Sequence, residues 1–227
     1  MKKLFVLAAA CCIAVSVFAQ ETKSIEGQNR SVEIQSIQTA AALAQYGYQN
    51  DSPTALIEAA RIFGTTQTQA GDCEGMSEVP QSEGAAKESG ISYDPQQLLA
   101  DAKDMAGNDT EINAMIKRTE QEIKEFARAT KGVVGGAEIF LGRVDSRSYN
   151  LYTFRFWGNE LAEVGVVGDG DTDLDLYIYD QNGDLVVRDI DYGDTCYCAW
   201  VPSRTSVYII KVVNLGNVYN NFTLATN

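Results

Sequence analysis

The chain has 227 residues, a formal net charge of −13 and no histidine. Such an acidic chain repels nucleic acid and anionic membrane surfaces, so we expect neither as a partner. Without imidazole, histidine-based catalytic triads and most zinc sites lose their usual base and ligand. The length accommodates one or two domains with a hydrophobic core.

The first residues, MKKLFVLAAACCIAVSVFAQ, have the features of a secretory signal. Two lysines precede an apolar run, and small side chains at Val17 and Ala19 predict cleavage before Gln20. Removing residues 1–19 takes away two positive charges, which changes the net charge from −13 to −15. A lipoprotein anchored on one of the two early cysteines is the alternative, but leucine is absent three residues before either. No other apolar run reaches the ~20 residues of a membrane span, so we expect a secreted or periplasmic protein.

Two segments before residue 65 have helical spacing. From Ser31 onward, apolar side chains recur on one face at Ile34, Ile37, Ala41, Ala44 and Tyr48. In NDSPTALIEAARIFG, Asp51 or Ser52 is the expected N-cap, Pro53 lies in the first turn and Gly64 follows the end. The two segments predict an antiparallel helical hairpin.

A second helical hairpin is predicted after a long connection. Residues 65–92 are polar and rich in glycine and serine, without periodicity, so we expect a mobile connection there. YDPQQLLADAKDMAG then predicts a helix with Asp94 as its cap and Gly107 as its end. A fourth helix is expected from about Thr110 to Thr130. Its inward residues are predicted to be Ile112, Met115, Ile116, Ile123 and Phe126, with Gly132 after its end. Residues 31–131 therefore predict a small helical bundle.

After KGVVGG the hydrophobic period changes from 3.6 to 2. Short apolar segments separated by turn residues follow: YNLYTFRFW, LAEVGVVG, LDLYIYD, GDLVVRDI, CYCAWVP, SVYIIKVVN and NFTLATN. Seven or eight strands at this spacing predict an antiparallel β-sandwich over residues 137–227. The fold class is therefore α+β. We expect the sandwich to fold without the helices, because the glycine pairs between them offer little to bury.

Residues 168–194, GDGDTDLDLYIYDQNGDLVVRDIDYGD, hold nine aspartates and one arginine. A two-residue Asn-Gly turn in this hairpin would place Asp189 and Asp191 on the apolar face of the strand. A three-residue turn, opened by Asp180 with Gly183 in the left-handed position, keeps them on the polar face. Burying unpaired charges costs more than crowding them at a surface, so we expect the three-residue turn.

That register pairs Asp175 with Asp189 and Asp173 with Asp191. Calcium binds six to eight oxygens, and carboxylates are among its preferred ligands. The hairpin therefore predicts a calcium site formed by Asp173, Asp175, Asp189 and Asp191, with Asp169, Asp171 and Asp194 in the flanking loops able to complete the shell. The alternative is a solvated acidic face with no metal. A helix-loop-helix calcium loop is excluded, because Leu174 stands where that loop requires glycine.

Two stretches of the C-terminal half are similar to a known family. GDGDTDLDLYIYDQNGDLV and DYGDTCYCAWVPSRTSVYIIKVVNLGNVYNNFTLATN resemble the bacterial pre-peptidase C-terminal domain, over about residues 137–227. The resemblance implies a small β-sandwich that serves as an accessory module of exported proteins, some of whose relatives bind calcium or fibrous substrates. The preceding helical segment is too short to be a peptidase, so the resemblance does not imply protease activity.

Other residue types leave alternatives open. Five aromatic residues could form a ligand platform or could pack in the sandwich: Trp157, Trp200, Tyr192, Tyr197 and Tyr219. Cys196 and Cys198 point to the same face of one strand, so they are poorly placed to bond each other. Either could pair with Cys73, or all three could remain thiols.

These patterns favour an exported, non-catalytic binding or adhesion protein. Paired carboxylates can hydrolyse glycosides, but they need a cleft that one sheet face does not provide. Serine and cysteine nucleophiles lack a histidine base. The expected partner is an extracellular or envelope protein or a glycan. The alternatives are an accessory module or partner of a secreted hydrolase, and a component of a surface assembly.

Overall fold

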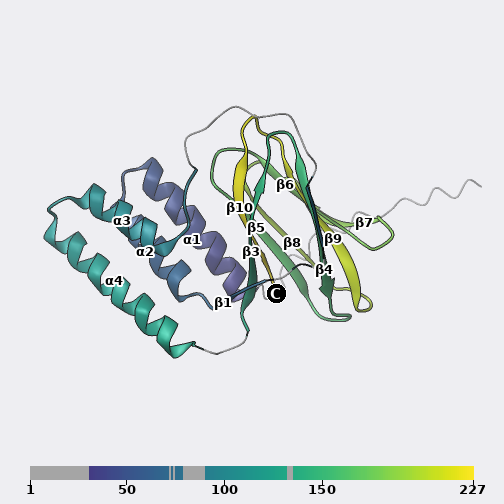
Figure 1. Ribbon diagram of the computed structural model, residues 1–227, viewed down its shortest axis with the longest axis horizontal. Helices are drawn as coiled ribbons and strands as arrows, with labels where there is room; N and C mark the ends of the chain where they lie inside the picture. Colours follow the sequence, from purple (N-terminus) through teal and green to yellow (C-terminus); the bar gives the residue numbers. More distant parts are fainter. Residues whose placement is uncertain (1–30, 72, 74, 79–89, 132–134) are drawn as a thin grey trace, which may run out of the picture.

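The computed structural model describes residues 31–227 except 72, 74, 79–89 and 132–134. The expected signal peptide, its cleavage site before Gln20, and Gly132 lie outside these residues. The described part forms three layers, a helical layer followed by two stacked β-sheets (Figure 1). The α+β class predicted from the sequence is confirmed. In the part that the structure describes, no helix is both long and apolar enough to cross a membrane.

The helical layer contains α1 (Val32–Gln49), α2 (Pro53–Thr65), α3 (Pro95–Ala106) and α4 (Thr110–Ala129). The ends of α3 follow the predicted signals. The Asp94 carboxylate accepts a hydrogen bond from the N–H of Gln97 at 3.0 Å, and Gly107 ends α3 with φ of 53°. Capping of this kind satisfies backbone donors that the first turn of a helix leaves without partners.

Two details of the helices differ from the prediction. Gly64 lies inside α2 rather than after its end. A Cβ atom at this position would lie only 2.6 Å from the nearest atom of the Ile123 side chain in α4. The glycine therefore permits close helix packing. Met115 is partly exposed, whereas Ile116 is buried in the bundle.

The sandwich consists of two five-stranded sheets. Sheet A has the order β1–β3–β10–β5–β8, and sheet B has the order β2–β4–β9–β6–β7. Their strands are β1 (Thr68–Ala70), β2 (Gly75–Glu78), β3 (Ala137–Val144), β4 (Tyr149–Phe156), β5 (Ala162–Gly168), β6 (Leu174–Tyr179), β7 (Leu185–Asp189), β8 (Thr195–Trp200), β9 (Ser206–Asn214) and β10 (Asn220–Thr226). The seven segments expected from period 2 all form strands, and β3 is the eighth.

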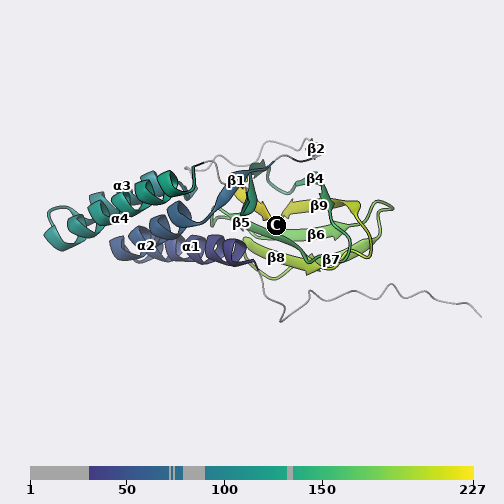
Figure 2. The ribbon, with the colours of Figure 1, turned by 90° about the horizontal axis from the view of Figure 1, so that it is seen from below.

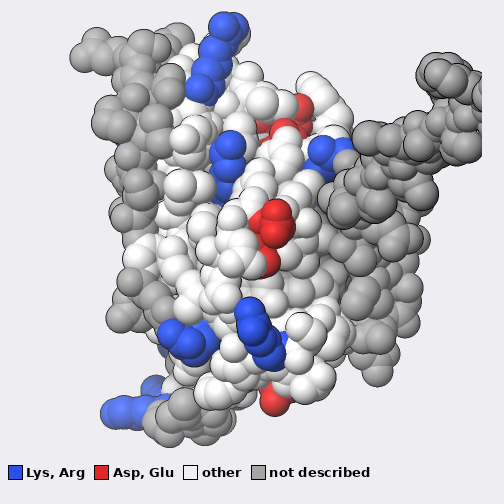
Figure 3. Space-filling model, turned by 90° about the vertical axis from the view of Figure 1, so that its right-hand side faces the viewer, with Lys and Arg blue, Asp and Glu red and all other residues white. Residues whose placement is uncertain are grey.

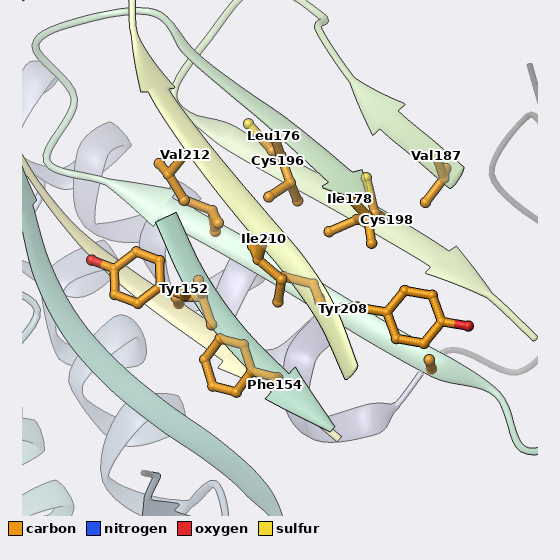
Figure 4. Close-up of a cluster of buried hydrophobic side chains, with 14 of the residues drawn as sticks. Tyr152, Phe154, Leu176, Ile178, Val187, Cys196, Cys198, Tyr208, Ile210 and Val212 are labelled. Carbon is orange, nitrogen blue, oxygen red and sulfur yellow. The ribbon is translucent and has the colours of Figure 1, made fainter. Parts of the chain in front are cut away.

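The main core lies between the two sheets (Figure 4). Alternate residues of β4, β6 and β9 point inward, so Tyr152, Ile178 and Ile210 pack with Cys196 and Cys198 of β8. The opposite positions on the same strands point outward. This alternation is the period-2 pattern that the sequence displays.

The stretch expected to be a connection without regular structure requires a correction. β1 and β2 both lie within residues 65–92. β1 pairs in parallel with β3, and β2 pairs antiparallel to β4, so each sheet takes one edge strand from the N-terminal half. The two strands are short and polar, and only pairing with distant residues makes them regular.

Helix α1 packs on the outer face of sheet A (Figure 2). Ile34, Ile37 and Ala41 of the helix form one hydrophobic cluster with Val167 and Tyr197 of the sheet. Polar contacts add to it, because the Gln38 side chain donates a hydrogen bond to the carbonyl of Cys196 at 3.1 Å. The expected boundary at residues 131–137 therefore separates two layers that share an apolar interface, and independent folding of the sandwich stays a prediction.

Candidate functional site

The β6–β7 hairpin contains the predicted turn but not the predicted register. Asp180 opens the turn by accepting a hydrogen bond from the N–H of Gly183 at 3.0 Å, and Gly183 has φ of 87°. The register then shifts between Ile178 and Tyr179, which leaves Val186 as the extra residue of a β-bulge. Beyond the bulge Asp189 lies opposite Leu176, so the predicted pairing of the aspartates is wrong.

The bulge turns Asp189 toward the other sheet. Its Oδ2 accepts a hydrogen bond from the backbone N–H of Tyr197 in β8 at 2.7 Å, and its Oδ1 accepts one from the N–H of Asp191 at 3.2 Å. A carboxylate without partners at this inward position would be costly. Backbone donors supply the partners, so the cost that was expected does not arise.

The remaining predicted ligands are dispersed among separate hydrogen bonds. Asp173 accepts from the N–H of Gly193 at 2.8 Å, and Asp175 accepts from the hydroxyl of Tyr177 at 3.0 Å. Asp171 and Asp191 are exposed. Within the described residues, no group of three or more acidic or cysteine side chains is placed to hold a metal ion. The predicted calcium ligands therefore do not form one cluster within the described residues, and calcium binding stays a prediction.

Asp194 and Asp169 support the loops where the helical layer meets the sandwich. Asp194 accepts hydrogen bonds from the Gln45 side chain of α1, at 3.2 Å, and from the N–H of Gly170. Asp169 accepts from the N–H of Asn221 at 2.9 Å. Burial raises the pKa of Asp194, and the nearby Asp169 carboxylate adds to that effect. Five of the nine aspartates of this stretch, Asp169, Asp173, Asp180, Asp189 and Asp194, therefore accept hydrogen bonds from backbone N–H groups of loops or strands.

Asp175 shows that the like charges still interact. Burial raises the pKa of its carboxyl, the hydrogen bond from Tyr177 lowers it, and the charges of Asp173 and Asp189 raise it further. The repulsion expected from the sequence is thus present without the convergent geometry of a metal site.

A different surface emerges from the outward positions of sheet B, which we call the tyrosine face. It includes Tyr149, Leu151, Arg155, Tyr177, Tyr179, Arg188, Ile209 and Lys211, from β4, β6, β7 and β9. Asp175 of β6 occupies an outward position on the same face, where its carboxylate accepts the hydrogen bond from Tyr177. The strand register aligns Leu151, Lys211, Tyr177 and Arg188 in one row across four strands. This face lies on the side of the molecule away from the helices, and Figure 3 looks onto it.

Aromatic and cationic groups are in contact on the tyrosine face. The Tyr177 and Tyr179 rings stack with centroids 6.3 Å apart and an angle of 16° between their planes. Lys211 Nζ lies 4.2 Å from the centroid of the Tyr149 ring and 5.9 Å from that of Tyr177. In Figure 3 most of the surface is uncharged, with Lys and Arg side chains spread over it and few acidic ones. The sequence indicated these strands but did not single out their outward residues as a surface.

The aromatic platform suggested by the sequence is not formed. Trp200 and Tyr197 are buried, so they belong to the packing alternative. Trp157 is 63% exposed and Tyr192 is 96% exposed, in the loops after β4 and β7 respectively. Tyr219 is covered by the guanidinium of Arg143, 3.8 Å from its ring centroid.

Of the two alternatives for the cysteines, the structure has the one with three thiols and no disulfide among them. Cys73, Cys196 and Cys198 are all free, and Cys73 packs against the same core as the other two. Cys196 Sγ donates a hydrogen bond to the carbonyl of Leu174 at 3.0 Å. Burial raises the pKa of both core thiols far above the usual value, so neither provides a thiolate nucleophile.

Comparison with known proteins yields only a weak likeness of fold. No protein-family model matches the sequence, and no curated protein matches it. One similar structure is the pre-peptidase C-terminal domain of a collagenase from Bacillus anthracis, with a TM-score of 0.34 and 11% identity over 41% of this chain and 91% of that one. Another is the Yersinia pseudotuberculosis-derived mitogen, with a TM-score of 0.32 and 15% identity over 41% and 86%. A third is PliG, a periplasmic inhibitor of g-type lysozyme from Aeromonas hydrophila, with a TM-score of 0.32 and 12% identity over 40% of this chain and 84% of that one. Scores this low support no inference about function.

Proposed function

We propose that the chain is an exported, non-catalytic binding protein whose tyrosine face docks a protein partner that presents carboxylates among apolar side chains. The observation that supports this most directly is the contrast between the two outer faces of the sandwich. Helix α1 covers sheet A, whereas all four helices lie away from sheet B (Figures 1 and 2). An outward sheet face with Ile209 and Leu151 beside three tyrosines has the composition of an interaction surface.

The chemistry of this face favours a protein over a small molecule. Tyrosine and arginine are enriched at the energetic centres of protein interfaces, and the tyrosine face combines both. The four strands of the tyrosine face, spaced about 4.8 Å apart, form an open surface about 14 Å wide, which suits another protein surface better than a small ligand.

The charge of the face indicates the kind of partner. Arg155, Arg188 and Lys211 point outward in a chain whose formal net charge is −13. A cationic face on an acidic protein attracts an acidic partner. The same partner is repelled by the acidic remainder of the protein surface, so it is steered toward this face. A secreted hydrolase could itself be this partner, which would make the chain an accessory subunit. A glycan stacked on the tyrosines is the second candidate ligand.

Site-specific crosslinking tests the proposal. A photo-crosslinking amino acid is placed at Arg188 on the tyrosine face, or at exposed Arg204 in the loop before β9 as the matched control. Proteins captured from position 188 and not from position 204 are purified, and their affinity for the chain is measured directly. We expect Lys211→Glu to weaken that affinity at least about tenfold, as is typical of reversing a charge near the centre of an interface.

Three results would contradict the proposal. Equal capture from both positions, or unchanged affinity in Lys211→Glu, would mean that the tyrosine face is not the docking surface. Binding of a purified glycan that requires Tyr177 and Tyr179 would replace the protein partner with a carbohydrate. Turnover of a substrate by the purified chain would contradict the non-catalytic part.

A further inference from the structure

Glu163 of β5 lies beneath the first turn of α1 and is only 2% exposed. Its two carboxylate oxygens both accept from the backbone nitrogen of Ser31, at 2.9 Å and 3.0 Å. The Tyr197 hydroxyl donates to Oε1 at 2.5 Å, and the Asn227 amide donates to Oε2 at 3.3 Å. These partners are neutral, and no lysine or arginine of the described residues forms an ion pair with Glu163.

A peptide N–H is an incomplete partner for this carboxylate. It carries one hydrogen, which two oxygens must share, and it brings no positive charge. A carboxylate removed from water without a counter-charge is costly, because neutral donors replace only part of its hydration. A primary ammonium at the same nitrogen would offer three hydrogens and one positive charge to the same two oxygens.

The sequence supplies a route to that ammonium. The residue before Ser31 is Arg30, and the segment between the predicted signal-peptide cleavage and Ser31 is QETKSIEGQNR. We propose that an arginine-specific endopeptidase hydrolyses the Arg30–Ser31 bond, and that the new α-ammonium of Ser31 forms a buried ion pair with Glu163. This proposal is independent of the tyrosine face.

The chemistry is an ordinary hydrolysis. The carbon–nitrogen bond between Arg30 and Ser31 breaks, and the oxygen of one water molecule bonds to the Arg30 carbonyl carbon, giving a carboxylate. The hydrogens of that water go to the medium and to the Ser31 nitrogen. At neutral pH the amine takes up a proton, since a free α-amino group has a pKa of ~7.7–8.0. No atom is oxidised or reduced.

The ion pair would lock the helical layer onto the sandwich. Ser31 is the N-cap of α1, and Ile34 and Ile37 in the next turns pack into the cluster with sheet A. A positive charge at a helix N-terminus is disfavoured by the helix dipole, so a free amine there needs a strong compensating anion. Glu163 lies where that anion is needed. Cleavage requires the first turn of α1 to separate transiently from sheet A. The new Ser31 ammonium then binds Glu163 more strongly than the peptide N–H did.

Three forms of the chain distinguish this idea from simple helix capping. They are residues 20–227, residues 31–227 with a free Ser31 amine, and residues 31–227 with that amine acetylated. Each is made with Glu163 and with Glu163→Gln. We expect the free-amine form to have the highest Tm at pH 6, by roughly 2–4 °C, the shift that about 1 kcal/mol produces in a chain of this length. Glu163→Gln should remove that advantage, because the amide has no charge to pair.

The pH dependence provides a second readout. Pairing with Glu163 raises the pKa of the α-ammonium in the folded chain above its unfolded value. The added stability is therefore fully present below pH ~7.7 and is lost as the pH rises through the folded pKa. The acetylated form should show no such loss. Equal Tm values in the three forms, or an advantage that persists in Glu163→Gln, would overturn the proposal.

Maturation itself is tested on protein exported by the organism that produces it. N-terminal sequencing should give SVEIQ, and Arg30→Gln should shift the end away from Ser31. An exported protein that begins at Gln20 would overturn the processing step even if the engineered free-amine form proved more stable.

Discussion

Asp189 at the end of β7 accepts a hydrogen bond from the backbone N–H of Tyr197 in β8, with 2.7 Å between oxygen and nitrogen. The two residues belong to different sheets, so this bond joins an edge of sheet B to an edge of sheet A. The side chain of Asp189 points inward because the bulge at Val186 moves the end of β7 by one residue. An acidic residue thus holds the sandwich closed at this corner.

Removal of the Asp189 carboxylate should destabilise the fold. Asp189→Ala leaves the Tyr197 N–H without its acceptor, which is expected to lower the free energy of unfolding by about 1–3 kcal/mol. Asp189→Asn should cost less, because an amide oxygen can accept the same bond. Urea unfolding followed by circular dichroism measures both. The control is Asp191→Ala, an exposed position where we expect a change within about 0.5 kcal/mol. Equal effects at the two positions would mean that the inter-sheet bond contributes little.

Asp194 should make stability depend on pH. Burial raises the pKa of its carboxyl in the folded chain above 3.8, the ordinary value. The folded state therefore favours the protonated form, and this group's contribution to stability declines as the pH rises from about 3.8 through the folded pKa. Asp194→Asn removes that titration while the amide oxygen can still accept from Gly170. Subtracting the two curves of unfolding free energy against pH isolates Asp194. A difference that stays constant with pH would contradict the expectation.

Local sequence signals predicted the elements of this fold well. The cap at Asp94, the glycine after α3 and the alternation along β4 and β9 all act within a few residues. The turn from Asp180 to Gly183 is likewise local, and the structure contains it. Such signals fix helices, strands and turns because each depends on near neighbours in the chain.

The features that the sequence did not predict depend on distant partners. β1 and β2 are regular only because β3 and β4, more than sixty residues further along, pair with them. The bulge is favourable because a donor on β8 meets Asp189 once the register has shifted. The tyrosine face likewise exists only after β4, β6, β7 and β9 are placed side by side. No window of a few residues contains that information.

Calcium should have little effect on stability if the aspartates serve as acceptors for backbone groups. Binding at a hundredfold excess over Kd would add about 2.7 kcal/mol, which corresponds to roughly 5–11 °C in Tm at about 2–4 °C per kcal/mol. We expect 5 mM calcium and 5 mM magnesium, concentrations of the order relevant to weak extracellular calcium sites, to change Tm equally. A larger rise with calcium, abolished in Asp173→Asn, would restore the site predicted from the sequence.

The sandwich should not reach its full stability without the helical layer. A fragment of residues 137–227 lacks β1 and β2, which makes the longer strands β3 and β4 the new edges of the two sheets. It also exposes the outer face of sheet A, where Val167, Tyr197 and Ala225 pack against α1. Unpaired edges and a bared apolar face favour aggregation. We therefore expect this fragment to aggregate, or to unfold at a clearly lower Tm than residues 31–227, contrary to the expectation from the sequence.

A single substitution tests the same dependence within the whole chain. Ile34 of α1 is fully buried in the cluster with sheet A, so Ile34→Ala should lower the free energy of unfolding by about 2–5 kcal/mol. Tyr46→Ala, on an exposed position of the same helix, is the matched control and should change it by about 0.5 kcal/mol or less. Sheet and helix signals should be lost in one transition, because α1 and sheet A share a core. If Ile34→Ala instead melts the helices first and leaves a folded sandwich with the Tm of the parent chain, the two layers are energetically separate and the fragment should fold alone.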